Sequence, residues 1–383
     1  MSLKHSQIRA RLQGIARTVN VMTTSPITEP PSDEQTGLFA YQVATQMSGA
    51  VTAAMIHLGD RLGLYRALAA APRPLTAQEL ADAAGLVERW VREWAHNQAA
   101  AGLVRHDDGR FSLSAEAVAV LVDEQHEMCL IGMFHQLPQD LRRVEVLPDS
   151  FRTGIGRDYD DHGPEAAIGM ERSFEPWMRA HLITDLIPLL DDVEQRLRAG
   201  ARAADVGCGA GGVVLQLAAA FPASRFAGYD ISQYALARAR ERLAERGLPN
   251  AEFHDPREAP MPDDGSLGLV TAFDCLHDMT DPAGIMATIR RALSDDGTWL
   301  LVDIKAYDSL AENLERNPMA AMMYGTSVIT CLASSLSEPG GAGLGTLGLS
   351  AERAEAMAAD AGFTRFRRLD VDHPINAFYE IRP

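Results

Sequence analysis

The chain has 383 residues, of which 46% are hydrophobic and 23% charged, so its composition fits two folded domains, or one large domain with additions, and excludes wholesale disorder. The 52 acidic and 35 basic residues give a net charge of −17, which weighs against a broad nucleic-acid-binding surface. No apolar run reaches the roughly 18 residues that a membrane-spanning helix needs. The four cysteines are widely spaced and form no CxxC pair, so we expect no metal site and a reducing, cytoplasmic location.

The first 36 residues differ from the rest of the chain. Residues 1–20 are basic, contain no acid and place apolar side chains at helical spacing, a pattern that suits a transit peptide or a membrane-surface helix. Met22 opens a segment rich in Thr, Ser and Pro, which is typical of a disordered tail. We therefore expect residues 1–36 to be a disordered tail or a start-site extension, with Met1 and Met22 as the two candidate starts.

Residues 37–125 are predicted to form a mainly helical winged-helix domain. The first part, residues 37–70, has the pattern of one helix, and its run of Gly and Ala allows close packing against a second subunit. Thr76 begins the next helix with Glu79 three residues later, which is the spacing of a capping box. Gly85 is expected to end that helix.

The following segment completes a helix-turn-helix with a wing. A helix is expected from Val87 to about Ala101, and two short strands flank residues 106–109, which is a hairpin signal. Such a module can bind DNA through its second helix, but residues 75–116 contain seven acids and four arginines, a net charge of −3. We expect a scaffold or dimerisation role, with DNA binding as the alternative. The apolar side of the second helix is predicted to comprise Val87, Trp90, Val91, Trp94 and Ala95.

Residues 126–199 are expected to form a helical linker and substrate cap, with a Gly- and Asp-rich loop at residues 149–165. Bulky and polar side chains are concentrated in this segment. They either pack one helix on another or line a substrate pocket. The candidate pocket residues are Phe134, His135, Met170, Phe174, Trp177 and His181.

From residue 200 to residue 383 strands and helices alternate, which is the pattern of a doubly wound parallel sheet. A predicted strand at residues 203–206 runs into the glycine-rich segment 207–212 and then into a helix. Glycine is needed where the chain turns sharply and a ligand approaches the backbone. The spacing alone fits both a dinucleotide-binding GxGxxG loop and a GxGxG loop.

Three acids indicate which ligand the loop binds. Asp205 stands just before the loop, where a carboxylate repels a pyrophosphate but suits an ammonium group. Asp230 ends the second predicted strand and can accept hydrogen bonds from two ribose hydroxyls. Asp255 ends the third, where a side chain can meet the exocyclic amine of adenine. Acids facing an ammonium group, a ribose and an adenine, without a phosphate cradle, indicate S-adenosylmethionine.

The segments 204–211, 228–230 and 297–303 resemble class I S-adenosylmethionine-dependent methyltransferases. The resemblance covers about residues 200–383 and implies an α/β, Rossmann-like sheet of seven strands in the order 3-2-1-4-5-7-6, closed by a C-terminal hairpin. It also implies cofactor contacts from the loop and the strand ends. These are Asp205, Gly207, Cys208, Gly209, Gly211, Asp230, Ile231, Asp255, Phe273 and Asp274.

His277 follows the fourth predicted strand, in the sequence Phe-Asp-Cys-Leu-His-Asp-Met of residues 273–279. Ligands of open α/β sheets bind beyond the carboxyl ends of the strands, so His277 is placed to face a methyl acceptor. The segment resembles the His-Asp-Trp signature of small-molecule O-methyltransferases, which implies a general base at His277, although Met279 replaces the tryptophan. The other interpretation is that His277 fills the junction between strand and helix. Candidate carboxylates to orient it are Asp278, Asp303 and Asp308.

An insertion at residues 308–348 follows the fifth predicted strand. Residues 318–331 are predicted to be helical and rich in methionine, and the glycine-rich segment 334–348 has the composition of a mobile flap. Met323 is a candidate pocket residue here, with helix packing as the alternative.

From residue 37 onward the chain is similar to actinobacterial methyltransferases with an N-terminal winged-helix domain. This resemblance implies a homodimer formed through the N-terminal helices and a small-molecule acceptor. We expect methylation of a hydroxyl group. The alternatives are N- or C-methylation of a small metabolite, and a DNA-binding regulator that uses the methyltransferase fold as a sensor.

Overall fold

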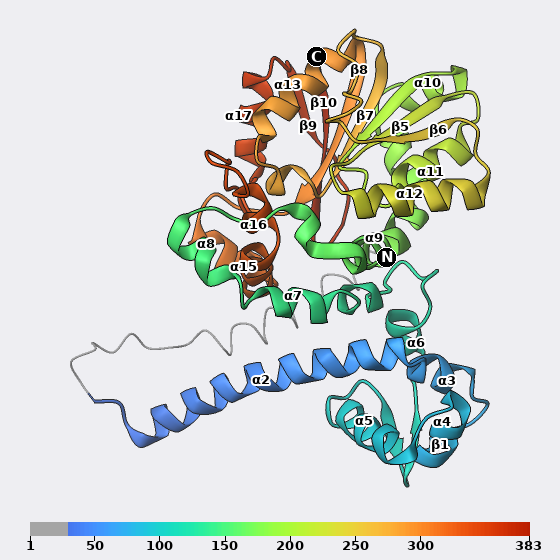
Figure 1. The fold of residues 1–383 in the computed structure, drawn as a ribbon, viewed down its shortest axis with the longest axis vertical. Coiled ribbons are helices and arrows are strands. Elements are labelled where there is room, and N and C mark those ends of the chain that lie inside the picture. Colours follow the sequence, from blue (N-terminus) through green and yellow to red (C-terminus); the bar gives the residue numbers. More distant parts are fainter. Residues whose placement is uncertain (1–29) are drawn as a thin grey trace.

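The computed structural model describes residues 30–383, so most of the expected tail, with both candidate starts, lies outside the described residues. A small N-terminal domain and a larger α/β domain are joined by a helical cap (Figure 1). No helix of residues 30–383 is both long enough and apolar enough to cross a membrane.

The N-terminal domain confirms the predicted winged helix. Its three strands pair in the order β1-β3-β2, and Thr76 and Glu79 form the expected capping box at the start of α4. Gly85 ends α4 with a positive φ of 67°. The elements are α2 (Asp33–Arg61), α3 (Leu64–Ala70), β1 (Leu75–Thr76), α4 (Ala77–Ala84), α5 (Glu88–Ala100), β2 (Arg105–Asp107) and β3 (Arg110–Ser112).

Two details of this domain differ from the prediction. The helix expected at residues 37–70 begins four residues earlier, because Ser32 caps it, and it breaks at Gly63, where φ is +72°. The prediction that Trp90 lies on the buried side of α5 is wrong, since its side chain is 80% exposed. Burial in α5 begins only at Val91, so the first turn of α5 extends beyond the packed part of the helix.

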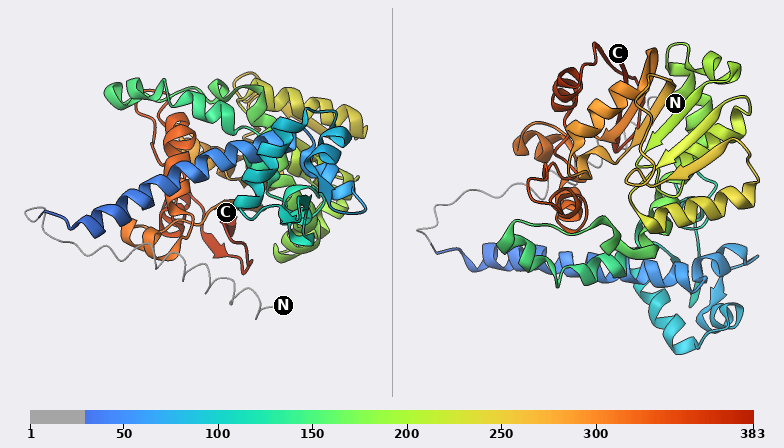
Figure 2. Two further views of the ribbon diagram at one scale, coloured as in Figure 1. Left: turned by 90° about the horizontal axis from the view of Figure 1, so that it is seen from below. Right: turned by 45° about the horizontal axis from the view of Figure 1, so that its top comes forward.

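The cap is helical, as predicted, and lies between the N-terminal domain and the sheet. Figure 2 shows its helices running alongside α2 beneath the α/β domain. The Gly- and Asp-rich loop is shorter than expected, because helices occupy both of its ends. The elements are α6 (Ala115–Leu121), η1 (Ile131–Phe134), α7 (Leu137–Arg143), α8 (Leu147–Thr153), η2 (Tyr159–His162), α9 (Gly163–His181), η3 (Leu182–Leu186), η4 (Ile187–Leu189) and α10 (Val193–Ala199).

The large domain is built on a seven-stranded sheet with the order β6-β5-β4-β7-β8-β10-β9, which confirms the predicted order 3-2-1-4-5-7-6. Five strands are parallel, and β10 pairs antiparallel with β8 and β9. The strands are β4 (Arg202–Val206), β5 (Arg225–Tyr229), β6 (Ala251–His254), β7 (Leu267–Phe273), β8 (Leu293–Ile304), β9 (Arg365–Arg368) and β10 (Asn376–Arg382).

Helices cover both faces of this sheet, each over its own apolar cluster (Figure 1). Leu215 of α11 is fully buried in one cluster, and Trp299 of β8 in the other. This double cover explains why the central strands are mostly apolar. The remaining elements are α11 (Gly212–Ala220), α12 (Gln233–Arg246), η5 (Leu276–Asp278), α13 (Pro282–Ala292), α14 (Leu310–Arg316), α15 (Ala320–Ile329), α16 (Cys331–Ser335) and α17 (Ala351–Asp360).

Candidate active site

The glycine loop leaves β4 at the carboxyl edge of the sheet. Gly207, Gly209 and Gly211 all have positive φ, between 53° and 76°. A Cβ atom on Gly211 would lie 2.4 Å from the ring of Phe253, so this position requires glycine for space as well as for conformation. A Cβ atom on Gly209 would meet nothing within 4 Å, which shows that the loop borders open space at this residue.

Asp230 follows β5 and holds the glycine loop. One carboxylate oxygen accepts a hydrogen bond from the backbone N–H of Gly209 at 2.8 Å, and the other accepts one from the N–H of Ser232 at 2.8 Å. Burial raises the pKa of Asp230, and the two N–H donors oppose that rise. Ile231, the next residue, is 48% exposed. The acid is therefore fixed beside the loop with oxygen lone pairs still available to a ligand.

The other two expected acids have different surroundings. Asp205 is buried on β4, where it accepts a hydrogen bond from the Thr271 hydroxyl at 2.6 Å, and burial raises its pKa to about 7. Asp255 pairs with Arg257 at 2.6 Å, and this guanidinium lowers the pKa of Asp255. A cation bound near Asp205 would stabilise its charged form.

The reactive end of the site is formed where β7 and β8 end side by side. His277 lies on η5 with 3% of its surface exposed, and its Nδ1 donates to Oδ1 of Asp303 at 2.6 Å. Burial lowers the pKa of His277, but the nearby Asp303 and Cys331 side chains together outweigh burial, and the net shift is upward. Of the three carboxylates that could orient His277, Asp303 is the one that binds it, because the pairing of β7 with β8 brings it there.

Asp274 stands between β7 and η5 in a left-handed conformation, with φ of 48°. Its carboxyl group accepts a hydrogen bond from Asn376 of β10. Burial and the neighbouring Asp303 raise the pKa of Asp274 to about 8. Phe273 and Cys208, two further expected contacts, lie at the edge of the same site, partly buried and buried respectively.

The cap supplies residues that sequence reasoning missed. The carboxylate of Asp160 accepts hydrogen bonds from the Ser232 hydroxyl at 2.6 Å and from the N–H of Gln233 at 3.2 Å, at the start of α12. On the other side, the N–H of Gly156 donates to the carbonyl of Leu336 at 2.6 Å. Residues 154–162, the loop after α8 together with η2, thus connect both walls of the site. The Gly- and Asp-rich composition of this segment was the sequence feature that could have indicated this role.

The candidate pocket residues have different surroundings, and their role as a pocket stays a prediction. The ring of Trp177 packs edge-on against that of His373, with the ring centroids 4.5 Å apart. Trp177 also packs against His181, which forms a hydrogen bond with Glu127. Met170 and Phe174 of α9 are 36% and 39% exposed, Phe134 packs against the core of the N-terminal domain, and Met323 is buried in α15.

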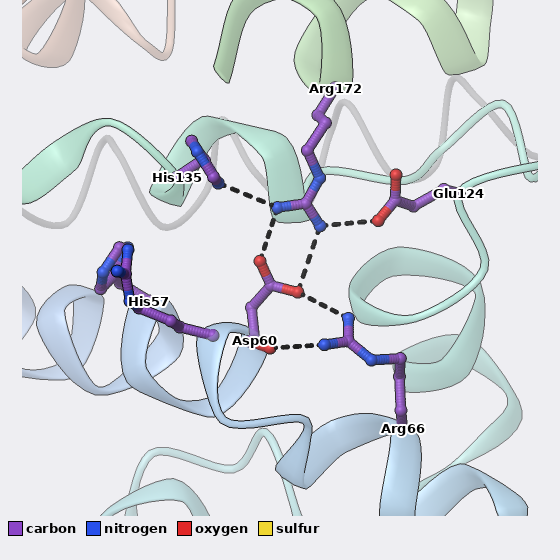
Figure 3. A pocket seen from close by; sticks show the side chains of 7 residues that line it. His57, Asp60, Arg66, Glu124, His135 and Arg172 are labelled. Carbon is purple, nitrogen blue, oxygen red and sulfur yellow. Dashed lines mark hydrogen bonds and ion pairs between the residues drawn. The ribbon is translucent and has the colours of Figure 1, made fainter. Parts of the chain in front are cut away.

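His135 lines a separate pocket of about 280 Å³ between the N-terminal domain and the cap (Figure 3). At its centre Asp60 accepts hydrogen bonds from Arg66 and Arg172, and Arg172 also reaches Glu124 at 2.6 Å. These charges join α2 to α9 and form the joint between the two parts of the chain. The lining residues are His57, Asp60, Arg61, Arg66, Glu124, His135 and Arg172. Within residues 30–383 no group of three or more His, Cys, Asp or Glu side chains could hold a metal ion.

Comparison with known proteins agrees with this architecture. Residues 197–362 match the family described as Methyltransferase domain, and residues 50–122 match the Rv2258c-like winged HTH domain. A curated relative, 27-O-demethylrifamycin SV methyltransferase of Amycolatopsis mediterranei, is 32% identical over 140 residues, which are 36% of this chain. The chain covers 50% of that relative's length and smaller shares of two others.

Two solved structures share the fold over nearly the whole chain. The mitomycin 7-O-methyltransferase MmcR is 22% identical, with a TM-score of 0.66 over 92% of this chain and 99% of the other. Human N-acetylserotonin methyltransferase, solved in complex with S-adenosylmethionine, is 15% identical, with a TM-score of 0.65 over 94% and 99%.

The site described above fits S-adenosylmethionine. Asp205 is a buried carboxylate that a cationic ammonium group would stabilise, Asp230 has lone pairs for ribose hydroxyls, and Gly209 leaves space beside the loop. The chain therefore carries a class I S-adenosylmethionine-dependent methyltransferase domain at residues 197–362, preceded by an Rv2258c-like winged HTH domain at residues 50–122.

Proposed function

We propose that this protein methylates a hydroxyl group of a small molecule, with His277 as the general base. The observation that carries the proposal is the hydrogen bond between His277 Nδ1 and Asp303 at the carboxyl edge of the sheet, beside the glycine loop. Bound S-adenosylmethionine supplies an electrophilic methyl group. A neutral hydroxyl is a poor nucleophile, so it needs a base that removes its proton as the oxygen attacks.

Different residues of the chain contribute to proton removal and to cofactor binding. Asp303 fixes the tautomer of His277 with Nδ1–H toward the carboxylate, which leaves Nε2 as the proton acceptor. Asp303 also stabilises the imidazolium that forms when Nε2 takes the proton. Asp230 and the glycine loop would hold the adenosine part of the cofactor, and Asp205 would face its ammonium group. The burial of His277 excludes water from the reaction.

The charges of the winged helix support an enzyme rather than a DNA-binding regulator. Both arginines of α5 pair with acids one turn away, Arg89 with Glu93 at 2.5 Å and Arg92 with Glu88 at 3.2 Å. Arginines paired in this way have little charge left for a phosphate backbone. Four unpaired cysteines support our proposal of a cytoplasmic location.

Calorimetric titration with S-adenosylmethionine and S-adenosylhomocysteine tests the cofactor site. We expect Asp230→Ala to weaken binding of both ligands by about 10²- to 10³-fold, because each hydrogen bond to a charged group contributes roughly 1.5–3 kcal/mol. The matched control, Asp149→Ala on the exposed end of α8, should bind like the wild type. Equal affinities of the two variants for these ligands would show that Asp230 does not bind the cofactor. NADH should not bind.

We also propose a homodimer that forms through α2. Apolar side chains recur every four residues along the free part of this helix, and all of them are exposed: Phe39, Val43, Met47 and Val51. Gly49 has open space where a Cβ atom would be, which permits a close approach of a second helix.

Light scattering tests this dimer. Wild-type protein should have twice the mass of one chain, and the double variant Val43→Glu, Met47→Glu should have the mass of one chain, because charges at the centre of an apolar contact are desolvated without partners. Thr45→Glu, on the opposite side of α2, should remain dimeric. A monomeric wild type would contradict the proposal.

A further inference from the structure

One arginine of α12 lies buried between the cap and the glycine loop. Arg242 is 4% exposed, and its Nη1 donates a hydrogen bond to the backbone carbonyl of Ala210 at 2.8 Å. Ala210 stands between Gly209 and Gly211, which both have positive φ. Glycine leaves the neighbouring peptide groups free to rotate at little cost, so the bond from Arg242 fixes a part of the loop that the loop sequence leaves free.

The other two side-chain nitrogens of Arg242 are bound by the cap. Nη2 donates to Oε1 of Glu175, and Nε lies 3.3 Å from Oε1 of Glu171. These acids are one turn apart on α9, which packs against α12 (Figure 1), and their side chains are only 12% (Glu171) and 13% (Glu175) exposed. The guanidinium of Arg242 therefore joins the cap to the glycine loop, with a partner for each of its nitrogens.

The carboxylate of Glu175 also lies beside the end of the glycine loop. A Cβ atom on Gly212, the first residue of α11, would be 3.4 Å from Cγ and 3.5 Å from Oε1 of Glu175. A negative charge at this place is favoured by the N-terminus of α11. One side chain of the cap is thus held both by the arginine that binds the loop and by the helix into which the loop runs.

The glycine loop is anchored from two sides. On one side the N–H of Gly209 donates to the carboxylate of Asp230. On the other side Arg242 donates to the carbonyl of Ala210. Among residues 30–383 the N–H of Ala210, which lies between these two bonds, has no hydrogen-bond partner. The two anchors therefore set the direction of a peptide group that remains available to the cofactor.

We propose that Arg242 is a positioning residue for S-adenosylmethionine, and that Glu175 of the cap holds its guanidinium against the glycine loop. Arg242 acts through the backbone of Ala210 and not through a contact of its own with the cofactor. Without this bond the loop adopts several orientations, and the apparent affinity falls by the fraction of the time that the loop is competent to bind. This role concerns cofactor binding, so it does not depend on which group the protein methylates.

Arg242→Met tests the positioning role, with Arg238→Met as the matched control. Arg238 lies one turn earlier on α12 and binds the same cap residue, with Nε 2.7 Å from Oε2 of Glu171, but among the described residues it makes no hydrogen bond with the glycine loop. We expect calorimetry with S-adenosylhomocysteine to show at least about tenfold weaker binding by Arg242→Met and a change of less than about twofold in Arg238→Met. Both variants lose an ion pair with the cap, so a general loosening of the cap would affect them alike.

Hydrogen–deuterium exchange without cofactor gives a second readout. Glu175→Gln keeps the shape of the side chain but removes the charge that holds Arg242. We expect faster exchange in peptides that cover residues 207–212 than in the wild type, together with weaker binding of S-adenosylhomocysteine. The control is Glu241→Gln, whose carboxylate binds Arg238 at 2.6 Å on the exposed side of α12 and should leave exchange in the same peptides unchanged.

Equal losses of cofactor affinity in Arg242→Met and Arg238→Met would overturn this inference, because packing of the cap and not the bond to Ala210 would then hold the site. Unchanged affinity in a folded Arg242→Met protein would overturn it as well. If Arg242→Met does not fold, Glu175→Gln decides, and unchanged exchange in the loop peptides would contradict the proposal.

A kinetic assay separates this inference from the proposed function. Arg242→Met should raise the KM for S-adenosylmethionine about as much as it weakens binding, and should leave kcat within about threefold of the wild type. A wild type that binds the cofactor but transfers no methyl group to any hydroxyl compound would contradict the proposed function alone.

Discussion

Replacing His277 by glutamine should lower the turnover number of methyl transfer by about 10²- to 10⁴-fold, the range that general-base catalysis contributes. Glutamine has nearly the same reach but cannot accept a proton at neutral pH. The affinity for S-adenosylmethionine should stay within about twofold of the wild type, because the cofactor contacts come from other strands. Calorimetry for binding and single-turnover kinetics for the chemical step separate the two effects.

The pH dependence of turnover tests the same assignment. The Asp303 carboxylate raises the pKa of His277, so the base is protonated and inactive at low pH and activity should increase as pH rises through that pKa. Asp303→Asn removes the stabilising anion, so the midpoint of the pH profile should move to lower pH while the maximal rate falls. A His277→Gln enzyme whose turnover stays within threefold of the wild type would show that His277 only fills the junction between strand and helix.

Replacing Arg172 by methionine should lower the free energy of unfolding by about 3 kcal/mol, at the lower end of the range for breaking buried ion pairs. Both nitrogens of Arg172 bind Asp60, at 2.6 and 3.1 Å, and only 15% of the arginine side chain is exposed. Methionine keeps the apolar stem of the side chain but leaves Asp60 with Arg66 as its one remaining ion-pair partner among the described residues.

Urea denaturation measures this loss, and Arg152→Met is the matched control. Arg152 pairs with Asp149 on the surface, where the side chains are 72% and 85% exposed, so its removal should cost at most about 0.5 kcal/mol. Burial alone raises the pKa of Asp60, but Arg172 and Arg66 outweigh burial and the net shift is downward. The stability from this pair is therefore present above about pH 4 and lost as the pH falls further. Equal losses in the two variants would show that the joint contributes nothing to stability.

The parts of the fold that depend on local sequence could be predicted. The capping box of Thr76 and Glu79, the glycine turn after β4 and the acid after β5 are each encoded within a few residues, and the structure has all of them. The strand order followed from the resemblance, and the sheet confirms it.

The partners of His277 could not be predicted, because they come from distant parts of the chain. Asp303 lies 26 residues away and reaches His277 through the register of two parallel strands. From the sequence alone, Asp278 and Asp308 were equally good candidates to orient His277. Asp308 is instead bound to Ser350.

The candidate pocket residues show a different limit. They were grouped because bulky and polar side chains are concentrated in the cap, but composition does not tell which side of a helix faces the sheet. Phe174 is 39% exposed, and His135 belongs to the charged joint at Asp60. Trp90 was misplaced in the same way, since periodicity identifies an apolar side but not where its cover ends.

Residues 154–162, the loop after α8 together with η2, form a wall common to the proposed cofactor and acceptor sites. This segment is tied to α12 through Asp160 and to the end of α16 through Gly156, so it touches both the helix that follows Asp230 and the helix that packs against η5, which carries His277. A wall shared in this way cannot move away from one ligand without loosening the enclosure of the other. For the proposed function we therefore expect cofactor exchange and acceptor exchange to be linked, which would give a fixed order of binding and release.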